Sequence, residues 1–297
     1  MSESAVAPGS QVIRRQVLDP QPARDYRGTF ALDSRAPKVG DELAPGWEGL
    51  YFPFDTPLAA LRPDGSPAED GVVPAIDLPR RLYAGEDTTF HHPLVYGSLV
   101  EQRTSLAALV RKRGRSGELV FADIERVYSV DGVTAITSVW HDVFLGPSTA
   151  RPLQPLPNEE WQHSKTLTLD PRQLFRFSAI TFNTHRVHYD RPWATDVEGL
   201  DDLLVHGPLT RILMLDAIAR WRPERRVASF GITSVAPVFA GRPLRLAARD
   251  VAHGLEIVGL DSAGAALARG AATWHPSDKK WRHRPDRPVP LSGEVCG

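Results

Sequence analysis

The sequence predicts an α+β fold made of two related halves. Each half is expected to be a curved antiparallel sheet, and the second sheet to wrap around a central helix. Four strand-like segments between residues 80 and 145, one strongly apolar helical segment at 207–222 and a weak internal repeat carry this prediction. The chain divides accordingly into an N-terminal arm (1–40), a first half (41–146), a Pro-rich linker (147–158), a second half (159–280) and a polar tail (281–297).

Apolar residues alternate with charged ones in the first half, as in Val120, Ala122 and Ile124 against Asp123 and Glu125. Gly-containing turn signals and β-branched residues mark the neighbouring segments. We expect an antiparallel meander of four strands at 80–94, 98–113, 118–130 and 133–145. Strand-like stretches of the second half lie at 163–171, 226–239, 242–261 and 265–275.

Residues 207–222 form the one convincing helix. Gly207-Pro208 opens it and Pro223 ends it. Its sequence is apolar almost all round, which is typical of a helix buried inside a fold. The first half has no segment of comparable quality, and we expect the arm to hold at most one short helix.

The internal repeat is centred on one short motif. Residues 93–97, PLVYG, precede a long strand in the first half, and residues 237–241, PVFAG, do so in the second. Each half then reaches a Trp-His pair, at 140–141 and at 274–275. The shared order indicates a duplicated unit.

Composition excludes several classes of function. The formal net charge is −1 over 297 residues, so no strong field points to nucleic acid or an anionic membrane. No apolar run approaches the roughly 20 residues that span a bilayer. Residues 1–16 lack the apolar region of a secretion signal, so none is expected. The single cysteine, Cys296, permits no intrachain disulfide and no cysteine-based metal site. A cytoplasmic protein is expected.

Groups that can move protons concentrate in residues 175–194. The six of interest are Asn183, His185, Arg186, His188, Tyr189 and Asp190. His188 is a natural general acid or base, because an ordinary histidine titrates near neutrality. If the segment is extended, Asp190 points to the same face and could orient His188. At the start of the helix, the free N–H group of Gly207 could stabilise negative charge on a thioester oxygen, and a glycine there would let substrate approach closely.

Other interpretations of these residues stay open. His185 and His188, with Asp190 as a third ligand, could be half of a metal site, but no second ligand group is apparent and we expect no metal. His163, His206, His253 and His275 are expected to be structural. No serine-hydrolase elbow, phosphate loop or dinucleotide fingerprint occurs, so we expect no cofactor.

The pattern Phe-Asn-x-His-Arg-Val-His-Tyr-Asp, residues 182–190, resembles the MaoC-type (R)-specific hydratase/dehydratase superfamily, which has the hotdog fold. The resemblance is to the subgroup of hydroxyacyl-thioester dehydratase type 2 and the mesaconyl-C4-CoA or itaconyl-CoA hydratases. Segments 47–52, 79–85 and 90–94 resemble the N-terminal hotdog of the same proteins, so the resemblance covers roughly residues 40–280. It implies a double hotdog.

One departure from the superfamily pattern Asp-x-Asn-Pro-(Leu/Ile)-His affects the mechanism. His188 matches the catalytic histidine, but Asn183 holds the position of the aspartate and His185 that of the asparagine. An amide cannot act as a base, so either Asp190 supplies the carboxylate or Asn183 is a positioning group. The superfamily's His-Gly before the central helix is matched at residues 206–207, which supports the oxyanion role.

The resemblance implies a hydro-lyase that interconverts 2-enoyl and 3-hydroxyacyl thioesters of coenzyme A or an acyl carrier protein, without a cofactor. Gly207, His185, Arg186 and Tyr189 are expected to bind substrate, and Arg186 could contact the carboxylate of a dicarboxylic, mesaconyl-type acyl group. A hotdog thioesterase and a non-catalytic acyl-thioester binding subunit remain alternatives. A homodimer is expected by analogy.

Overall fold

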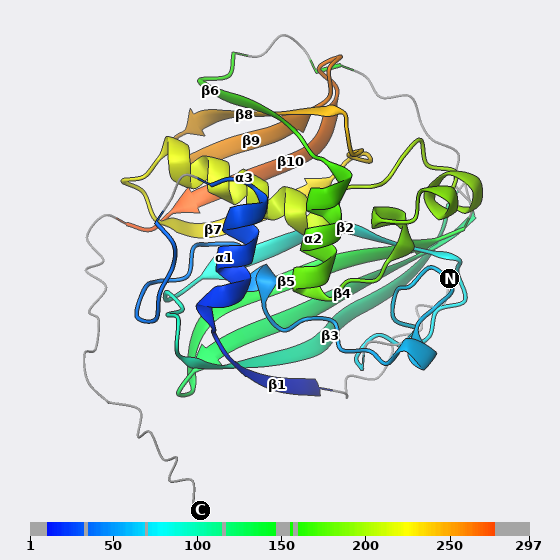
Figure 1. Cartoon of the computed structure of the whole chain (residues 1–297), viewed down its shortest axis with the longest axis horizontal. Coiled ribbons are helices and arrows are strands. Elements are labelled where there is room, and N and C mark those ends of the chain that lie inside the picture. The colour runs from blue at the N-terminus through cyan, green and yellow to red at the C-terminus, as the bar shows by residue number, and fades with distance from the viewer. Residues whose placement is uncertain are drawn as a thin grey trace, which may run out of the picture.

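In the computed structural model, the two predicted halves share one ten-stranded antiparallel sheet (Figure 1). The structure describes residues 11–32, 35–68, 71–114, 117–146, 155–156 and 160–276. The strands are β1 (Gln11–Val17), β2 (Arg80–Phe90), β3 (Leu99–Gly114), β4 (Gly117–Val130), β5 (Val133–Leu145), β6 (His163–Thr168), β7 (Val227–Ser234), β8 (Pro243–Val251), β9 (Gly254–Leu260) and β10 (Ala266–Trp274). The α-helices α1 (Pro20–Thr29), α2 (Pro171–Thr181) and α3 (Gly207–Trp221) lie on one face of this sheet. Within the described ranges, no helix has the length and apolar character needed to cross a membrane.

The strand order is the same in both halves when it is counted outward from the middle of the sheet. The order is β1-β3-β4-β5-β2-β7-β10-β9-β8-β6, and the halves join where β2 pairs with β7, with Gly85 opposite Thr233 and Thr89 opposite Ser229. The α+β class and the two related halves are thereby confirmed. The predicted meander is wrong in one respect: β2 lies beside β5, because it forms the joint between the halves, and not beside β3.

Backbone hydrogen bonds show the duplication more directly than the sequence does. The last residue of each repeated motif donates its N–H to the residue before an N-capping aspartate. Gly97 donates to Leu18 at 2.9 Å, and Gly241 donates to Leu169 at 2.8 Å. The five-residue motifs therefore occupy equivalent places.

The Trp-His part of the predicted repeat is wrong in register. The carbonyls of Ala135 and Leu267 are equivalent, because each accepts two N–H groups from the turn after β2 or β7. Trp140 lies five residues beyond the first carbonyl and Trp274 seven beyond the second, so the two tryptophans do not correspond.

Helix α3 is buried on all sides, as predicted. Its buried residues are Leu209, Thr210, Arg211, Ile212, Leu213, Met214, Leu215, Ala217 and Ile218. In the first half the equivalent place holds only a single 3₁₀ turn, η1 (Trp47–Leu50). The core of the molecule therefore centres on one helix that serves both halves.

The expectation of a separate N-terminal arm is wrong for its described part. Strand β1 pairs with β3 along its whole length, from Gln11 opposite Ser105 to Val17 opposite Leu99. Helix α1 follows, capped by the Asp19 side chain, and buries its apolar side in the core. The first half therefore begins at β1. The predicted tail and most of the predicted linker lie outside the described residues.

Candidate active site

The stretch 175–194 is mainly helical, not extended. Helix α2 begins with a capping box, in which Asp170 and Gln173 each bind the other's backbone N–H, and this signal favours a helix at that place. Phe182 then takes a left-handed conformation with φ 52° and ends the helix. A 3₁₀ turn, η3 (Arg186–His188), and one π turn, η4 (Trp193–Val197), complete the segment.

A cavity of about 390 Å³ lies between the two halves beside the start of α3. Four of the predicted site residues line it, namely Asn183, His185, His188 and Gly207. The first half supplies a wall that the sequence did not indicate, including Arg80, Arg81, Tyr83, Arg126, Trp140 and Asp142. The loop at 62–66, expected only as a connection, also reaches the cavity through Gly65 and Ser66.

His188 is held as a neutral imidazole. Its Nδ1 lies 2.7 Å from the carbonyl oxygen of Leu204, and since a carbonyl can only accept, Nδ1 carries the proton. Nε2 then presents a lone pair and has no partner among the described residues. Burial, and next the neighbouring His185, lower the pKa of His188 to about 3. The His188 imidazole therefore stays unprotonated at neutral pH.

His206 supports the ring of His188 from behind. The two rings stack with centroids 3.6 Å apart, and His206 Nε2 lies 2.8 Å from the Ser178 hydroxyl. Burial, followed by the nearby His188 and His185, keeps the pKa of His206 well below its usual value. This geometry is consistent with the structural role expected for His206.

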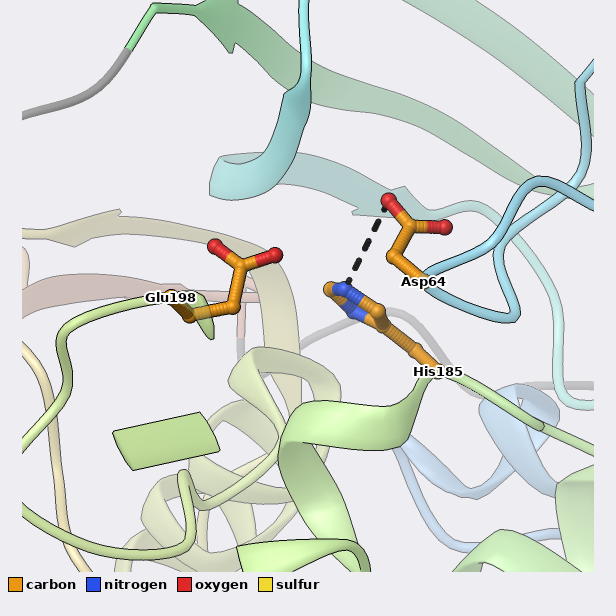
Figure 2. A group of neighbouring side chains, drawn as sticks. All are labelled: Asp64, His185 and Glu198. Carbon is orange, nitrogen blue, oxygen red and sulfur yellow. Dashed lines mark ion pairs between the residues drawn. The ribbon is translucent and has the colours of Figure 1, made fainter. Parts of the chain in front are cut away.

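His185 faces a carboxylate group that the sequence did not reveal. Figure 2 shows Asp64, His185 and Glu198 pointing toward one another from three different segments. The Asp64 Oδ2 atom, which has no hydrogen-bond partner, lies 4.0 Å from His185 Nε2. Burial lowers the pKa of His185 to about 4, because it outweighs the attraction of Asp64. His185 is therefore neutral as well.

The ligating atoms of this trio lie within 4.8 Å of one another, close enough to hold a metal ion. Guanidinium groups already neutralise both carboxylates. Arg80 Nε lies 2.8 Å from Glu198, and Arg62 Nε lies 3.5 Å from Asp64. A cation placed here would have to displace or face these arginines, so we interpret the trio as part of an ion-pair network.

Three predicted site residues lie outside the cavity lining. The alternative in which Asp190 supplies the carboxylate to His188 is not the one that the structure shows. The Asp190 carboxylate accepts two hydrogen bonds from Arg186, at 2.7 and 2.9 Å, because the helical turn brings residues four apart together. The Arg186 guanidinium lies 3.8 Å from the centre of the Trp193 ring. Tyr189 is 46% exposed, and its hydroxyl donates to the Thr184 carbonyl. Neither Arg186 nor Tyr189 is placed to bind substrate in the cavity, and the metal set that included Asp190 is not formed.

One side-chain atom of Asn183 is bonded to the backbone, and the other has no partner among the described residues. Its Oδ1 accepts a hydrogen bond from the N–H of His185 at 3.0 Å, which fixes the side chain at the edge of the cavity. The amide NH₂ remains a donor that can face a water molecule or hydroxyl group. This geometry supports Asn183 as a positioning group.

Gly207 places the start of α3 in the cavity wall. As the first residue of the helix, its N–H has no intrahelical acceptor. A Cβ atom at this position would lie 2.2 Å from Cδ1 of Tyr83. The expected reason for the glycine was close approach of substrate, but the structure shows that close packing of the Tyr83 ring already requires it.

Solved structures with the same fold cover almost the whole chain. The match to HtdX of Mycobacterium tuberculosis has a TM-score of 0.66 at 18% identity and covers 89% of this chain and 99% of that one. A MaoC-like dehydratase from Phytophthora capsici matches with a TM-score of 0.68 at 12% identity, covering 92% and 97%. A further M. tuberculosis protein, described as a double hotdog, matches with a TM-score of 0.59 at 14% identity, covering 91% and 97%. These likenesses confirm the double-hotdog fold.

The fold, together with the sequence relatives, defines the class: a protein of the MaoC-like hydratase and dehydratase superfamily. The chain is 38% identical over 224 residues to the mesaconyl-C4-CoA hydratase of Chloroflexus aurantiacus, with 74% of this chain and 80% of the relative covered. It is 33% identical over 87 residues to the mitochondrial hydroxyacyl-thioester dehydratase type 2 of Schizosaccharomyces pombe, with 29% of each chain covered. The family model of hydroxyacyl-thioester dehydratase type 2 matches residues 46–240, and the chain belongs to that family. It is therefore an enzyme of the hydro-lyase class.

Proposed function

We propose that the enzyme adds water to the double bond of a 2-enoyl thioester and, in the reverse direction, removes water from a 3-hydroxyacyl thioester. One observation carries the proposal: the free Nε2 of a neutral His188 shares a cavity with the N-terminus of α3. A base and an oxyanion donor on opposite sides of an acyl thioester are what this chemistry needs.

In the hydration direction, His188 Nε2 takes a proton from water while the hydroxyl oxygen bonds to the β-carbon. The electron pair of the double bond moves toward the thioester oxygen, where the Gly207 N–H stabilises the negative charge. His188 then returns the same proton to the α-carbon, so the enzyme ends unchanged. Asn183 holds the water through its free amide N–H groups, which replaces the carboxylate expected at that position.

The identity of the carrier follows by analogy. The C. aurantiacus relative is named for a coenzyme A thioester, and the S. pombe relative for hydroxyacyl thioesters. Coenzyme A is the carrier that we propose first, with acyl carrier protein as the alternative. A homodimeric assembly and a cytoplasmic location belong to the same proposal.

Turnover on a small panel of enoyl-CoA thioesters tests this function. The purified protein should remove the absorbance of the conjugated enoyl group without releasing free coenzyme A thiol. Release of thiol at the same rate would indicate a thioesterase instead. Tight binding with no change in either signal would indicate a non-catalytic acyl-thioester binding protein.

A further inference from the structure

The two halves present different surfaces to the interior. Among the described strand residues, every buried polar side chain belongs to the first half: Glu86, Thr88, Gln102, Ser138 and Asp142. The buried strand residues of the second half are apolar, apart from glycine. Polar groups on a buried sheet face are costly unless they are paired or have a ligand to bind. Glu86 and Thr88 are paired with Arg211, and of the five only Asp142 lines the cavity beside the start of α3. With Arg80, Arg81 and Arg126, Asp142 forms a polar wall that the first half supplies to this cavity.

Arg126 interrupts the apolar inward row of β4. Val120, Ala122 and Ile124 precede it on the same face and Tyr128 follows, all four of them buried. The inward direction places the Arg126 guanidinium at the cavity, where a charge needs a partner. Charged side chains are rarely found on such a face without a charged partner, so the position of Arg126 points to a ligand.

No carboxylate lies within ion-pair distance of Arg126 among the described residues. Its side chain lies over the ring of Trp140, 4.4 Å from the centroid. Asp142 is not available to it, because Trp140 Nε1 donates to one oxygen at 2.7 Å and Arg81 donates to the other at 2.8 Å. The cavity-lining Arg80 and Arg81 both have carboxylate partners, so Arg126 is the guanidinium left for a ligand.

Arg126 also lies next to the proposed reaction centre. A second cavity of about 140 Å³ adjoins the first, and six residues line both: Phe54, Thr56, Arg126, Trp140, Asn183 and Pro208. Asn183 is the proposed water-positioning group, so Arg126 shares the boundary that the β-carbon end of an acyl group would reach. A planar guanidinium with free donors matches a carboxylate in two-point geometry.

We propose that Arg126 binds a carboxylate carried by the acyl group, so that the substrates are dicarboxylic monothioesters with the free carboxylate at the β-carbon. This inference rests on the proposed function. It assigns the specificity to the first half and the chemistry to the second. Arg126 thereby takes the carboxylate-binding role that was expected of Arg186, because Arg186 is paired with Asp190 outside the cavity lining.

Two thioesters that differ only in the charged group test the proposal. Mesaconyl-C4-CoA carries a carboxylate where 3-methylcrotonyl-CoA carries a methyl group. Arg126→Gln should lower kcat/KM for mesaconyl-C4-CoA by about 100-fold, the order expected when a buried charge pair loses one member, and change it less than about 3-fold for 3-methylcrotonyl-CoA. Arg126→Lys should retain part of the preference, since it keeps the charge without the fork geometry.

Arg186→Gln is the matched control, because Arg186 also lies over a tryptophan but outside the cavity lining. It should leave the preference between the two thioesters unchanged. An equal loss on both thioesters in Arg126→Gln, with an unchanged midpoint of thermal unfolding, would overturn the proposal and assign Arg126 to the coenzyme or to the reaction itself. A lowered unfolding midpoint with an unchanged preference would overturn it in favour of a structural role.

A failure of the proposed hydratase function can be distinguished from a failure of the Arg126 proposal. If the wild type hydrates neither thioester, calorimetric binding of the same two compounds still tests Arg126. A preference for mesaconyl-C4-CoA that disappears in Arg126→Gln would support the carboxylate site even then. Equal binding of both compounds by the wild type would refute it.

Discussion

The two halves share the same backbone arrangement and each borders a cavity, but among the described residues only the cavity beside α3 is lined by the groups proposed for catalysis. Leu43 N–H donates to Leu94 O at 2.7 Å in the first half, and Val205 N–H donates to Val238 O at 2.8 Å in the second. These bonds make Pro45 the counterpart of Gly207. Proline has no N–H to offer an oxyanion. The scaffold alone therefore does not confer catalysis.

The cavity of the first half measures about 190 Å³ and includes Pro45 and His92 in its lining. Residues 18–41, which follow β1 as residues 169–204 follow β6, contain no histidine. The described part of the first half has no central helix, and its η1 and α1 are instead fixed to α3. Trp47 and Tyr26 both donate to Asp216 of α3, at 2.8 and 2.7 Å. Through these two hydrogen bonds the first half supports α3 of the second.

Among the substitutions that compare the two cavities, replacing His188 should have the largest effect on kcat. His188→Ala should reduce kcat for hydration by about 10²- to 10⁴-fold, the usual contribution of a general acid or base. His92→Ala, in the first-half cavity, should leave kcat unchanged. Both are measured by loss of enoyl absorbance, and similar losses in the two variants would mean that the first cavity also takes part in the reaction.

Asp216 accepts the hydrogen bonds from Trp47 and Tyr26 of the first half, and its carboxyl group should make the stability of the protein depend on pH. Burial raises the pKa of Asp216 to about 6, against a usual value of 3.8. Between these values the folded protein holds a proton that the unfolded chain has lost, so this contribution to stability falls as pH rises. The free energy of urea unfolding of the wild type minus that of Asp216→Asn should drop by up to about 3 kcal/mol from pH 4 to pH 7. A pH-independent difference would show that the carboxyl group titrates normally.

The acid limb of the rate profile should distinguish the buried histidines from ordinary ones. Since the pKa of His188 is lowered to about 3 and that of His185 to about 4, both stay neutral at pH 5. We expect kcat/KM to be flat from pH 5 to pH 8. A histidine with a pKa near 6.5 would instead lose about 30-fold at pH 5. A limb near pH 6.5 would contradict the neutral, buried state of the pair.

Gly207 and Gly49 are glycines of the two helical elements, α3 and η1, that can be compared by substitution. A Cβ at Gly207 would meet the Tyr83 ring at 2.2 Å, whereas one at Gly49 in η1 would meet Ile212 at an ordinary 3.6 Å. Gly207→Ala should destabilise the protein by about 1–3 kcal/mol in urea unfolding, as overpacking does, and should lower activity as α3 shifts. Gly49→Ala should be close to neutral. Equal effects would remove the packing explanation for Gly207.

The sequence was sufficient for much of the architecture and for half of the site. Periodicity predicted the strands and the buried helix, because both patterns are local. The β2–β7 joint and the polar wall depend on pairings between distant segments, which no local pattern contains. One usable signal was missed: Arg126 follows three apolar residues in an alternating row. The capping box at Asp170 was another, and it would have predicted that the site segment begins in a helix.

Asp190 is a case within the site where the local sequence did not predict the contact. Its replacement should have the smallest effect on kcat. The residue is two positions from His188, and only an extended backbone would place the two side chains together. The backbone instead forms a 3₁₀ turn, and the Asp190 carboxylate accepts hydrogen bonds from Arg186, which lowers the pKa of Asp190. Asp190→Asn should therefore keep kcat within about 2-fold, since a partly exposed ion pair outside the cavity lining contributes little. Its rate profile should match that of the wild type from pH 5 to pH 8. A loss as large as that of His188→Ala would mean that the carboxylate reaches the catalytic histidine when substrate is bound.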